Sequence, residues 1–339
     1  MLDISLSTGY KKRIDRDENS ILIIGKAKTE YRNKEIIQYS SIEEVEDVYG
    51  ESDLTTAFKE AKEIGAEKIF LCNCYKYVDY IEILNQIENR NFSYITPLFN
   101  FSETFITDGN KKMYLPEIYS NILNDKLVQI IMTDQHASLF ENLQHFVDIM
   151  NSINNDFKRH IGDNFYSGSN LCFVLNNLKE YKFANVALAS ILTQNSLRDY
   201  PTQNLGDVVF DVNSQDFFNQ ELAYFVYDDL AKTSIENFLN YHNELSPEKF
   251  VLVNLIKQKI LRALDFSEYA GSLYNPYLKL QLENKINETM QKFVGDIIER
   301  YIVHEFIISS DEEGMIIITI PLTIKPYNSI ESFDLSLEV

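Results

Sequence analysis

The sequence predicts a mixed α/β fold (α+β overall) with several domains. Buried-type β runs alternate with amphipathic helices over residues 20–246, the pattern of α/β units with parallel strand pairing. The remaining third reads as two helices followed by β-rich runs, and each end of the chain carries a short alternating segment. The predicted parts are an N-terminal arm (1–19), an α/β domain (20–100), a middle α/β domain (101–246), a C-terminal domain of two helices and a small sheet (247–328) and a C-terminal arm strand (329–339).

Residues 20–100 carry the strongest local signals. Ser41 and Glu44 form a capping box that predicts a helix ending near Gly50, and Asp53 is predicted to cap the next helix. Continuous apolar runs on either side predict buried strands. The expected strands are 20–26, 35–39, 68–74 and 94–98, and the expected helices are 41–50, 54–64 and 80–88.

In residues 101–246 strand and helix patterns continue to alternate, but fewer turn and capping residues mark their ends. Strands are expected at 127–133 and 171–175, and a loop at 195–206 is marked by Pro201 and Gly206. Helices are expected at 139–153, 183–193, 216–227 and 231–241, the last of which could be partly strand.

The pattern changes after Pro247. A long helix is expected at 250–264, and Pro276 is expected to open a second one at 277–294. The rest is predicted to be a strand at 297–308, a hairpin loop at 311–314 and a strand at 315–324.

Both arms show period-2 alternation, the signature of a strand with one wet face. A strand that ends a chain must find a partner sheet, its own or a neighbour's. The apolar positions are Leu2, Ile4 and Leu6 in the first arm and Ile330, Phe333, Leu335, Leu337 and Val339 in the second.

The bulk composition narrows the function classes. A formal net charge of -20 argues against nucleic acid as a direct partner, because phosphate binding needs clustered cations. No apolar run is long enough to insert into a membrane, and the N-terminus does not resemble a signal peptide, so synthesis in the cytosol is expected. Three cysteines are too few for a disulfide framework.

No catalytic constellation stands out in the sequence. Gly25-Lys26 follows a strand but lacks a phosphate-loop motif, and the five histidines are scattered. Cys72 and Cys74 lie on one side of a strand, where packing is favoured over a metal or redox role. We therefore predict no enzyme activity and no catalytic, cofactor-binding or metal-binding residues.

The chain resembles the sheath proteins of contractile phage tails and related phage-tail-like particles. The opening strand at 20–27 and the stretches EIIQYSSIEEVEDVYG, with its aromatic–Gly pair Tyr49-Gly50, and LTTAFKEAKEIGAEKIFLCNC are similar to that family. The most specific match is the C-terminal stretch IIITIPLTIKPYNSIESFDLSLEV. Residues 80–245 match more loosely, mainly at 184–207.

The resemblance implies a structural subunit that polymerises as stacked rings around an inner tube and contracts to drive the tube through a cell envelope. It implies a sheath-type fold whose C-terminal sheet is completed by arm strands of neighbouring subunits. The implied interface residues are those of the two arms together with Ile316, Ile318 and Ile320 of the acceptor, and Lys279, Lys285 and Lys292 are candidates for tube contact.

The same resemblance implies partners and a location. The partners are further copies of the chain, the tail tube protein, and baseplate and tail terminator proteins. The location is a virion tail, or a phage-tail-like particle, assembled in the host cytoplasm. Two alternatives stay open: an α/β ligand-binding protein or enzyme that uses residues 21–74, and a non-contracting tail terminator or initiator.

Overall fold

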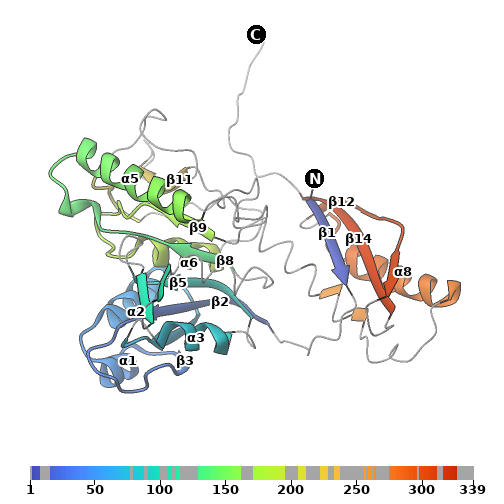
Figure 1. The fold of residues 1–339 in the computed structure, drawn as a ribbon, viewed down its shortest axis with the longest axis horizontal. Helices are drawn as coiled ribbons and strands as arrows, with labels where there is room; N and C mark the ends of the chain where they lie inside the picture. Colours follow the sequence, from blue (N-terminus) through green and yellow to red (C-terminus); the bar gives the residue numbers. More distant parts are fainter. Residues whose placement is uncertain are drawn as a thin grey trace, which may run out of the picture. The chain divides into compact units, whose positions relative to one another are not determined.

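The computed structural model of the chain contains two compact units, residues 14–250 and residues 1–13 with 251–339 (Figure 1). The predicted boundary between residues 100 and 101 has no counterpart in this division, because a single sheet runs through both predicted α/β domains. The described residues are 2–7, 16–76, 79–87, 91–99, 105–108, 111–114, 129–161, 171–194, 205–210, 222–227, 233–236, 256, 259–260, 263–264, 275–295, 298–310 and 316–326.

The unit of residues 14–250 is built on an eight-stranded sheet with the order β11-β10-β9-β8-β5-β2-β4-β3. Neighbouring strands from β10 to β4 are parallel, and only the edge strands β3 and β11 pair antiparallel. The strands are β2 (Arg16–Gly25), β3 (Ile36–Tyr39), β4 (Lys68–Asn73), β5 (Asn91–Pro97), β8 (Gln129–Met132), β9 (Leu171–Val174), β10 (Leu222–Tyr227) and β11 (Thr233–Glu236), with a separate hairpin of β6 (Phe105–Asp108) and β7 (Lys111–Tyr114).

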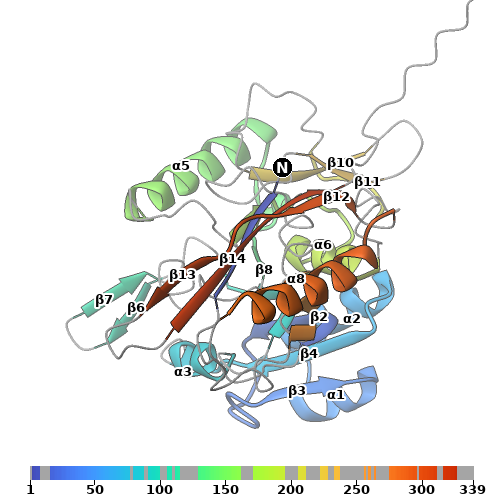
Figure 2. The same ribbon diagram turned by 90° about the vertical axis from the view of Figure 1, so that its right-hand side faces the viewer.

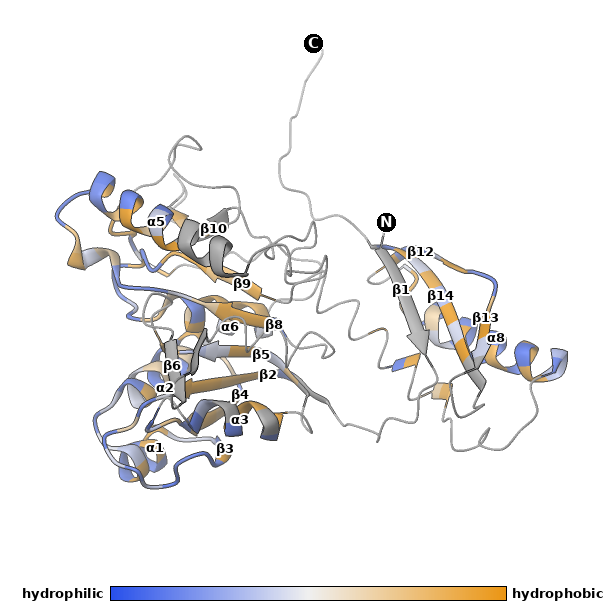
Figure 3. Ribbon diagram, in the orientation of Figure 1, coloured by the Kyte–Doolittle hydropathy of each residue, from blue (hydrophilic) through white to orange (hydrophobic). Residues whose placement is uncertain are grey.

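Helices cover both faces of this sheet. Leu22 and Ile24 of β2 share one core cluster with side chains of α3 (Asp79–Ile87) and α5 (Leu143–Ile161). Ile21 and Ile23 are also fully buried but point to the opposite face, because side chains alternate along a strand. There α2 (Asp53–Ile64) and α6 (Ala184–Gln194) pack on β2 and on each other, and α1 (Ile42–Tyr49) packs on α2. This double burial explains the hydrophobic colouring along the described part of β2 and along β8 (Figure 3).

Three local predictions for this unit are wrong. A helix was expected at 216–227, but the described part of this segment is strand β10; the segment 231–241, expected as a helix that could be partly strand, contains strand β11. The α5 helix begins at Leu143, and Leu139, expected on its apolar face, lies in the short 3₁₀ helix η2 (Ala137–Leu139) and is 71% exposed. Ser52, and not Asp53, caps α2, since its hydroxyl accepts a hydrogen bond from the Thr55 N–H at 3.4 Å.

The smaller unit is organised around β14 (Ile316–Pro326). One edge of β14 pairs antiparallel with β1 (Leu2–Ser7), and the other pairs with β12 (Ile298–Val303) and β13 (Ile307–Ser310). Figure 2 shows β1, β14 and β12 side by side, with the helix α8 (Pro276–Gln291) next to them. Pro276 occupies the first turn of α8, as predicted, and Asn275 caps the helix. Within the predicted helix 250–264, the described residues Ile256, Ile260 and Leu264 are buried at helical spacing.

The strand expected at 297–308 is interrupted at residues 304–306. Opposite this break lies Pro321, whose carbonyl oxygen accepts a hydrogen bond from the His304 N–H at 2.9 Å. In an antiparallel ladder a residue directs its N–H and C=O to the same side, so the N–H that proline lacks is missing from this side. The ladder therefore splits into β12 and β13.

Candidate assembly interface

The first predicted arm forms β1 and pairs with β14 of its own chain. The register places Leu2 opposite Ile324, Ile4 opposite Leu322 and Leu6 opposite Ile320. The sequence predicted β14 as an acceptor but assigned the donated strand to a neighbouring subunit. In the single chain the same edge is occupied from within.

The orientation of Pro321 also shows how β1 is held. Because Pro321 turns its carbonyl to the β12 side, its neighbours Ile320 and Leu322 turn their backbone polar groups to β1. The pairs Leu2–Ile324, Ile4–Leu322 and Leu6–Ile320 are thus the kind that exchanges two hydrogen bonds each, and the missing N–H of Pro321 costs this edge nothing.

One face of β14 forms the core of the smaller unit. Ile318, Ile320, Leu322 and Ile324 are each at most 8% exposed, and buried side chains of α8, including Leu282 and Ile286, belong to the same unit. Of the predicted acceptor residues, Ile318 and Ile320 are therefore core residues of the acceptor strand, while Ile316 begins β14. The other predicted arm residues, Ile330, Phe333, Leu335, Leu337 and Val339, lie outside the described residues.

The opposite edge of the small sheet is partly occupied. Ile298, the first residue of β12, exchanges backbone hydrogen bonds with Phe293 and Gly295, and among the described residues no strand pairs with the rest of the outer edge of β12. Beside it, a groove of about 580 Å³ is lined by residues of α8 and β12. Tyr301 spans part of this groove and donates a hydrogen bond to the Asn287 side-chain oxygen at 2.9 Å. Ile302 and Ile307 are 46% and 57% exposed near this edge.

The three lysines predicted to face a tube differ in their surroundings. Lys279 lies 3.8 Å from a Glu283 carboxylate oxygen and 5.7 Å from the ring centre of Phe306. Its charge is thus engaged within its own unit. Lys285 and Lys292 are exposed.

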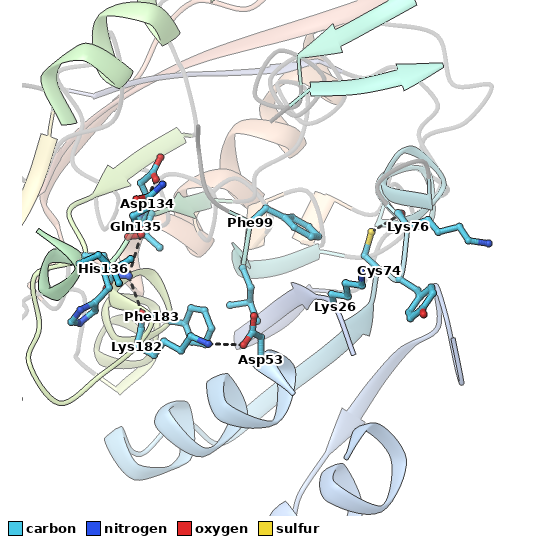
Figure 4. Close-up of a pocket in the computed structure, with 15 residues that line it drawn as sticks. Lys26, Asp53, Cys74, Lys76, Phe99, Asp134, Gln135, His136, Lys182 and Phe183 are labelled. Atoms are coloured by element: carbon cyan, nitrogen blue, oxygen red, sulfur yellow. Dashed lines mark hydrogen bonds and ion pairs between the residues drawn. The ribbon is translucent and has the colours of Figure 1, made fainter. Parts of the chain in front are cut away.

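The enzyme alternative has its own candidate site, a cavity of about 450 Å³ at the carboxyl ends of the parallel strands (Figure 4). Ligands of open α/β sheets commonly bind at this end, near the point where the strand order reverses. Here that point lies between β2 and β5, because β4 and β5 flank β2. Lys26, Asp134, His136 and Lys182 contribute polar side chains.

Two of these polar side chains, His136 and Lys182, are engaged by other groups of the protein. The His136 ring nitrogens lie 2.6 Å from the Leu178 carbonyl oxygen and 2.6 Å from the Ser138 hydroxyl. Lys182 donates to Asp53 at 2.7 Å. Burial raises the pKa of the Cys74 thiol to about 12, so no thiolate forms near neutral pH.

The space directly next to Gly25, at the end of β2, is filled by a side chain. A Cβ added to Gly25 would lie 2.6 Å from Cδ1 of Leu98, so this leucine occupies the space next to Gly25. Among the residues that the structure describes, no three His, Cys, Asp or Glu side chains are grouped to hold a metal ion. No described helix is long and apolar enough to cross a membrane.

Sequence reasoning missed Glu60, a buried carboxylate on α2. It accepts hydrogen bonds from the N–H groups of Lys182 and Phe183, at 2.7 and 3.1 Å, where α6 begins. Nothing in the local sequence signals this contact, because its partners are 122 and 123 residues away.

Comparison with known proteins identifies the fold. No protein-family model and no curated protein matches the sequence. Among solved structures, the chain is similar to one in the baseplate of the anti-feeding prophage, with a TM-score of 0.66, 8% identity, and 96% of this chain and 94% of that chain covered. The sheath of the PVC extracellular contractile injection system, in its contracted state, gives a TM-score of 0.64 at 9% identity, with 96% and 93% covered. A sheath tail protein from Listeria innocua gives 0.55 at 10% identity, with 94% of each chain covered.

The class of protein that this fold defines is the contractile sheath protein. The predicted resemblance is confirmed at the level of the fold, over nearly the whole chain. The neighbours are components of sheath and baseplate assemblies.

Proposed function

We propose that this protein is the subunit of a contractile tail sheath, which polymerises as stacked rings around an inner tube and contracts to drive the tube through a cell envelope. The observation that carries the proposal is the sheath fold, which covers 96% of the chain in its solved neighbours. The small sheet supplies the means of polymerisation, because both of its edges are suited to added strands.

Each arm has an acceptor edge in this proposal. In the polymer, Leu2, Ile4 and Leu6 pair with β14 of a neighbouring subunit in the register that they adopt within the chain. The segment 329–339 adds to the outer edge of β12, where Ile330, Phe333, Leu335, Leu337 and Val339 supply the alternating apolar positions. Because each subunit gives strands in one direction and receives them from another, the contact does not close and generates a helical polymer.

The other partners follow from this arrangement. The inner tube is a tail tube protein, contacted through exposed α8 residues such as Lys285 and Lys292, and the ends of the polymer meet baseplate and terminator proteins. Assembly takes place in the host cytoplasm. Contraction needs no bound nucleotide, because the extended sheath is a kinetically trapped state that relaxes to a better-packed one.

Deletion of residues 330–339 tests the proposal. We expect the full-length protein to form tubes in negative-stain electron microscopy and the deletion to abolish them, since it removes one of the two strands that join subunits. A matched control replaces Glu331, Asp334 and Glu338 by Gln, which keeps the apolar positions and should keep the tubes.

Three results would contradict the proposal. Long tubes formed by the deletion variant would refute the role of the second arm. Single rings that never stack would favour a tail terminator or initiator, and a monomer of normal size at all concentrations would favour the ligand-binding alternative.

A further inference from the structure

We infer that β1 is a self-closing strand that keeps the unassembled subunit inactive: residues 2–7 occupy the chain's own β14 edge and must leave it before a neighbour's strand can bind there. The inference rests on the proposed function, since it concerns how the sheath subunit enters the polymer. The assembly pathway then contains a closed state of the monomer and a step in which β1 leaves its own β14.

The closed state uses the whole acceptor. The ladder spans six consecutive positions, from Leu2–Ile324 to Ser7–Thr319. Ile320, Leu322 and Ile324 direct their N–H and C=O groups to β1, as the orientation of Pro321 shows. A strand from a second subunit finds none of these groups available.

Closed and exchanged forms make the same ladder, so their relative stability depends on how β1 is connected. Residues 2–7 and 316–326 belong to one compact unit of the same chain, so the closed ladder is an intramolecular contact. Such a contact forms at an effective concentration of roughly millimolar. At micromolar subunit concentration the closed form is therefore favoured.

Exchange needs an edge from another subunit at a comparable local concentration. The end of a growing polymer provides one, whereas dilute solution does not. The closed strand thus favours growth at existing ends and slows the spontaneous start of new tubes.

A disulfide that fixes β1 to its own β14 tests this. Ser7 and Thr319 face each other in a pair that does not exchange hydrogen bonds, with Cα atoms about 4.5 Å apart, within the range that a disulfide bridges. The three native cysteines are buried. The variant Ser7→Cys/Thr319→Cys should lose tube formation at least ten-fold when oxidised and regain it on reduction.

Two controls keep this result interpretable. Far-UV circular dichroism checks that the oxidised variant is folded. The mismatched variant Asp3→Cys/Thr319→Cys separates the two thiols by four positions along β14, about 13 Å, which no disulfide spans. It should form tubes equally well with and without oxidant.

Exchange is detected by splitting the pair between two chains. Single variants Ser7→Cys and Thr319→Cys, mixed, assembled and then oxidised, should give a covalent dimer on a non-reducing gel in the polymer fraction. The unassembled fraction of the same mixture should give none.

The outcomes separate this inference from the proposed function. Tubes formed equally fast by the oxidised and reduced double variant, or tubes without covalent dimers in the mixture, would overturn the closed-strand inference and leave the sheath assignment intact. Absence of tubes from the unmodified protein under every condition would overturn both.

Discussion

Glu60 joins two helices that are distant in sequence. It lies on α2, and its carboxylate receives the N–H groups of Lys182 and Phe183 at the start of α6. Burial raises its pKa from 4.5 to about 7, although the two backbone hydrogen bonds and the charge of Lys182 act in the opposite direction and Glu63 adds to the rise. The side chain therefore changes charge close to neutral pH.

This pKa predicts a pH-dependent stability. A group whose pKa is higher in the folded state contributes stability that is complete below pH 4.5 and is lost as the pH rises through about 7. Glu60→Gln should remove this dependence, so the free energy of unfolding of the native protein relative to the variant should fall by up to about 3 kcal/mol between pH 4.5 and pH 8. Urea denaturation followed by circular dichroism measures it, since the chain has no tryptophan.

In this experiment only the slope of the free energy of unfolding against pH tests the role of Glu60. Glutamine loses one acceptor for the two N–H groups, which lowers stability by about 1–3 kcal/mol at every pH. The exposed Glu67, close to the end of the same helix, supplies the control, and Glu67→Gln should leave the slope unchanged. Parallel pH curves for Glu60→Gln and the native protein would disprove the assignment.

At the scale of elements, the carboxyl ends of β2 and β5 decide whether the large unit can bind a ligand. The Leu98 N–H donates to the Ile24 carbonyl oxygen at 2.8 Å, which continues the parallel pairing, and its side chain lies against Gly25. Glycine is needed at this position because of the close approach of Leu98. In this chain the leucine fills the space directly next to Gly25 and lines one side of the cavity of about 450 Å³.

Substitution at Gly25 tests this packing. Gly25→Ala places a Cβ 2.6 Å from Leu98 Cδ1, and we expect a loss of about 1–3 kcal/mol in the free energy of unfolding. The double variant Gly25→Ala/Leu98→Ala should recover part of that loss, and the Leu98→Ala variant completes the cycle. Additive effects of the two substitutions would show that the two residues do not contact each other.

At the scale of the whole molecule, the net charge opposes assembly. Each subunit carries a formal charge of -20, so bringing copies together costs electrostatic repulsion. The range of this repulsion shrinks from about 30 Å at 0.01 M salt to about 8 Å at 0.15 M.

Tube formation should therefore respond to salt. We expect the critical subunit concentration, measured by sedimentation, to fall several-fold between about 0.01 M and 0.15 M sodium chloride as the Debye length contracts. Glycine at the same osmolality should have little effect. A critical concentration that rises with salt would mean that attractive charge pairs between subunits outweigh the net repulsion.

Local sequence patterns predicted the secondary structure correctly where a strand is fully buried or where a capping motif marks the start of a helix. The continuous apolar runs at 20–26 and 68–74 became β2 and β4, and the capping box at Ser41 became the start of α1. The run LAYFVY at 222–227 was misassigned, because a short apolar segment fits a buried helix as well as a buried strand. In the structure this segment pairs in parallel with β9, which makes it a strand.

The contacts between distant residues could not be read from the sequence. The break between β12 and β13 depends on Pro321 in a different strand, and the pKa of Glu60 depends on a helix more than a hundred residues away. The close packing at Gly25 likewise depends on Leu98, which follows the neighbouring strand β5.

The sequence by itself determined that the chain begins with a one-sided strand, and that the run IIITIPLTI is a suitable acceptor. It left the origin of the donated strand open, because period-2 alternation specifies the face of a strand and carries no information about its partner. Only the tertiary structure decided that β1 can reach and fill the edge of its own β14, in a register set by the apolar positions on both strands. The physical reason is that pairing within one chain is intramolecular, so the chain's own edge has a higher local concentration than an edge of another subunit in dilute solution.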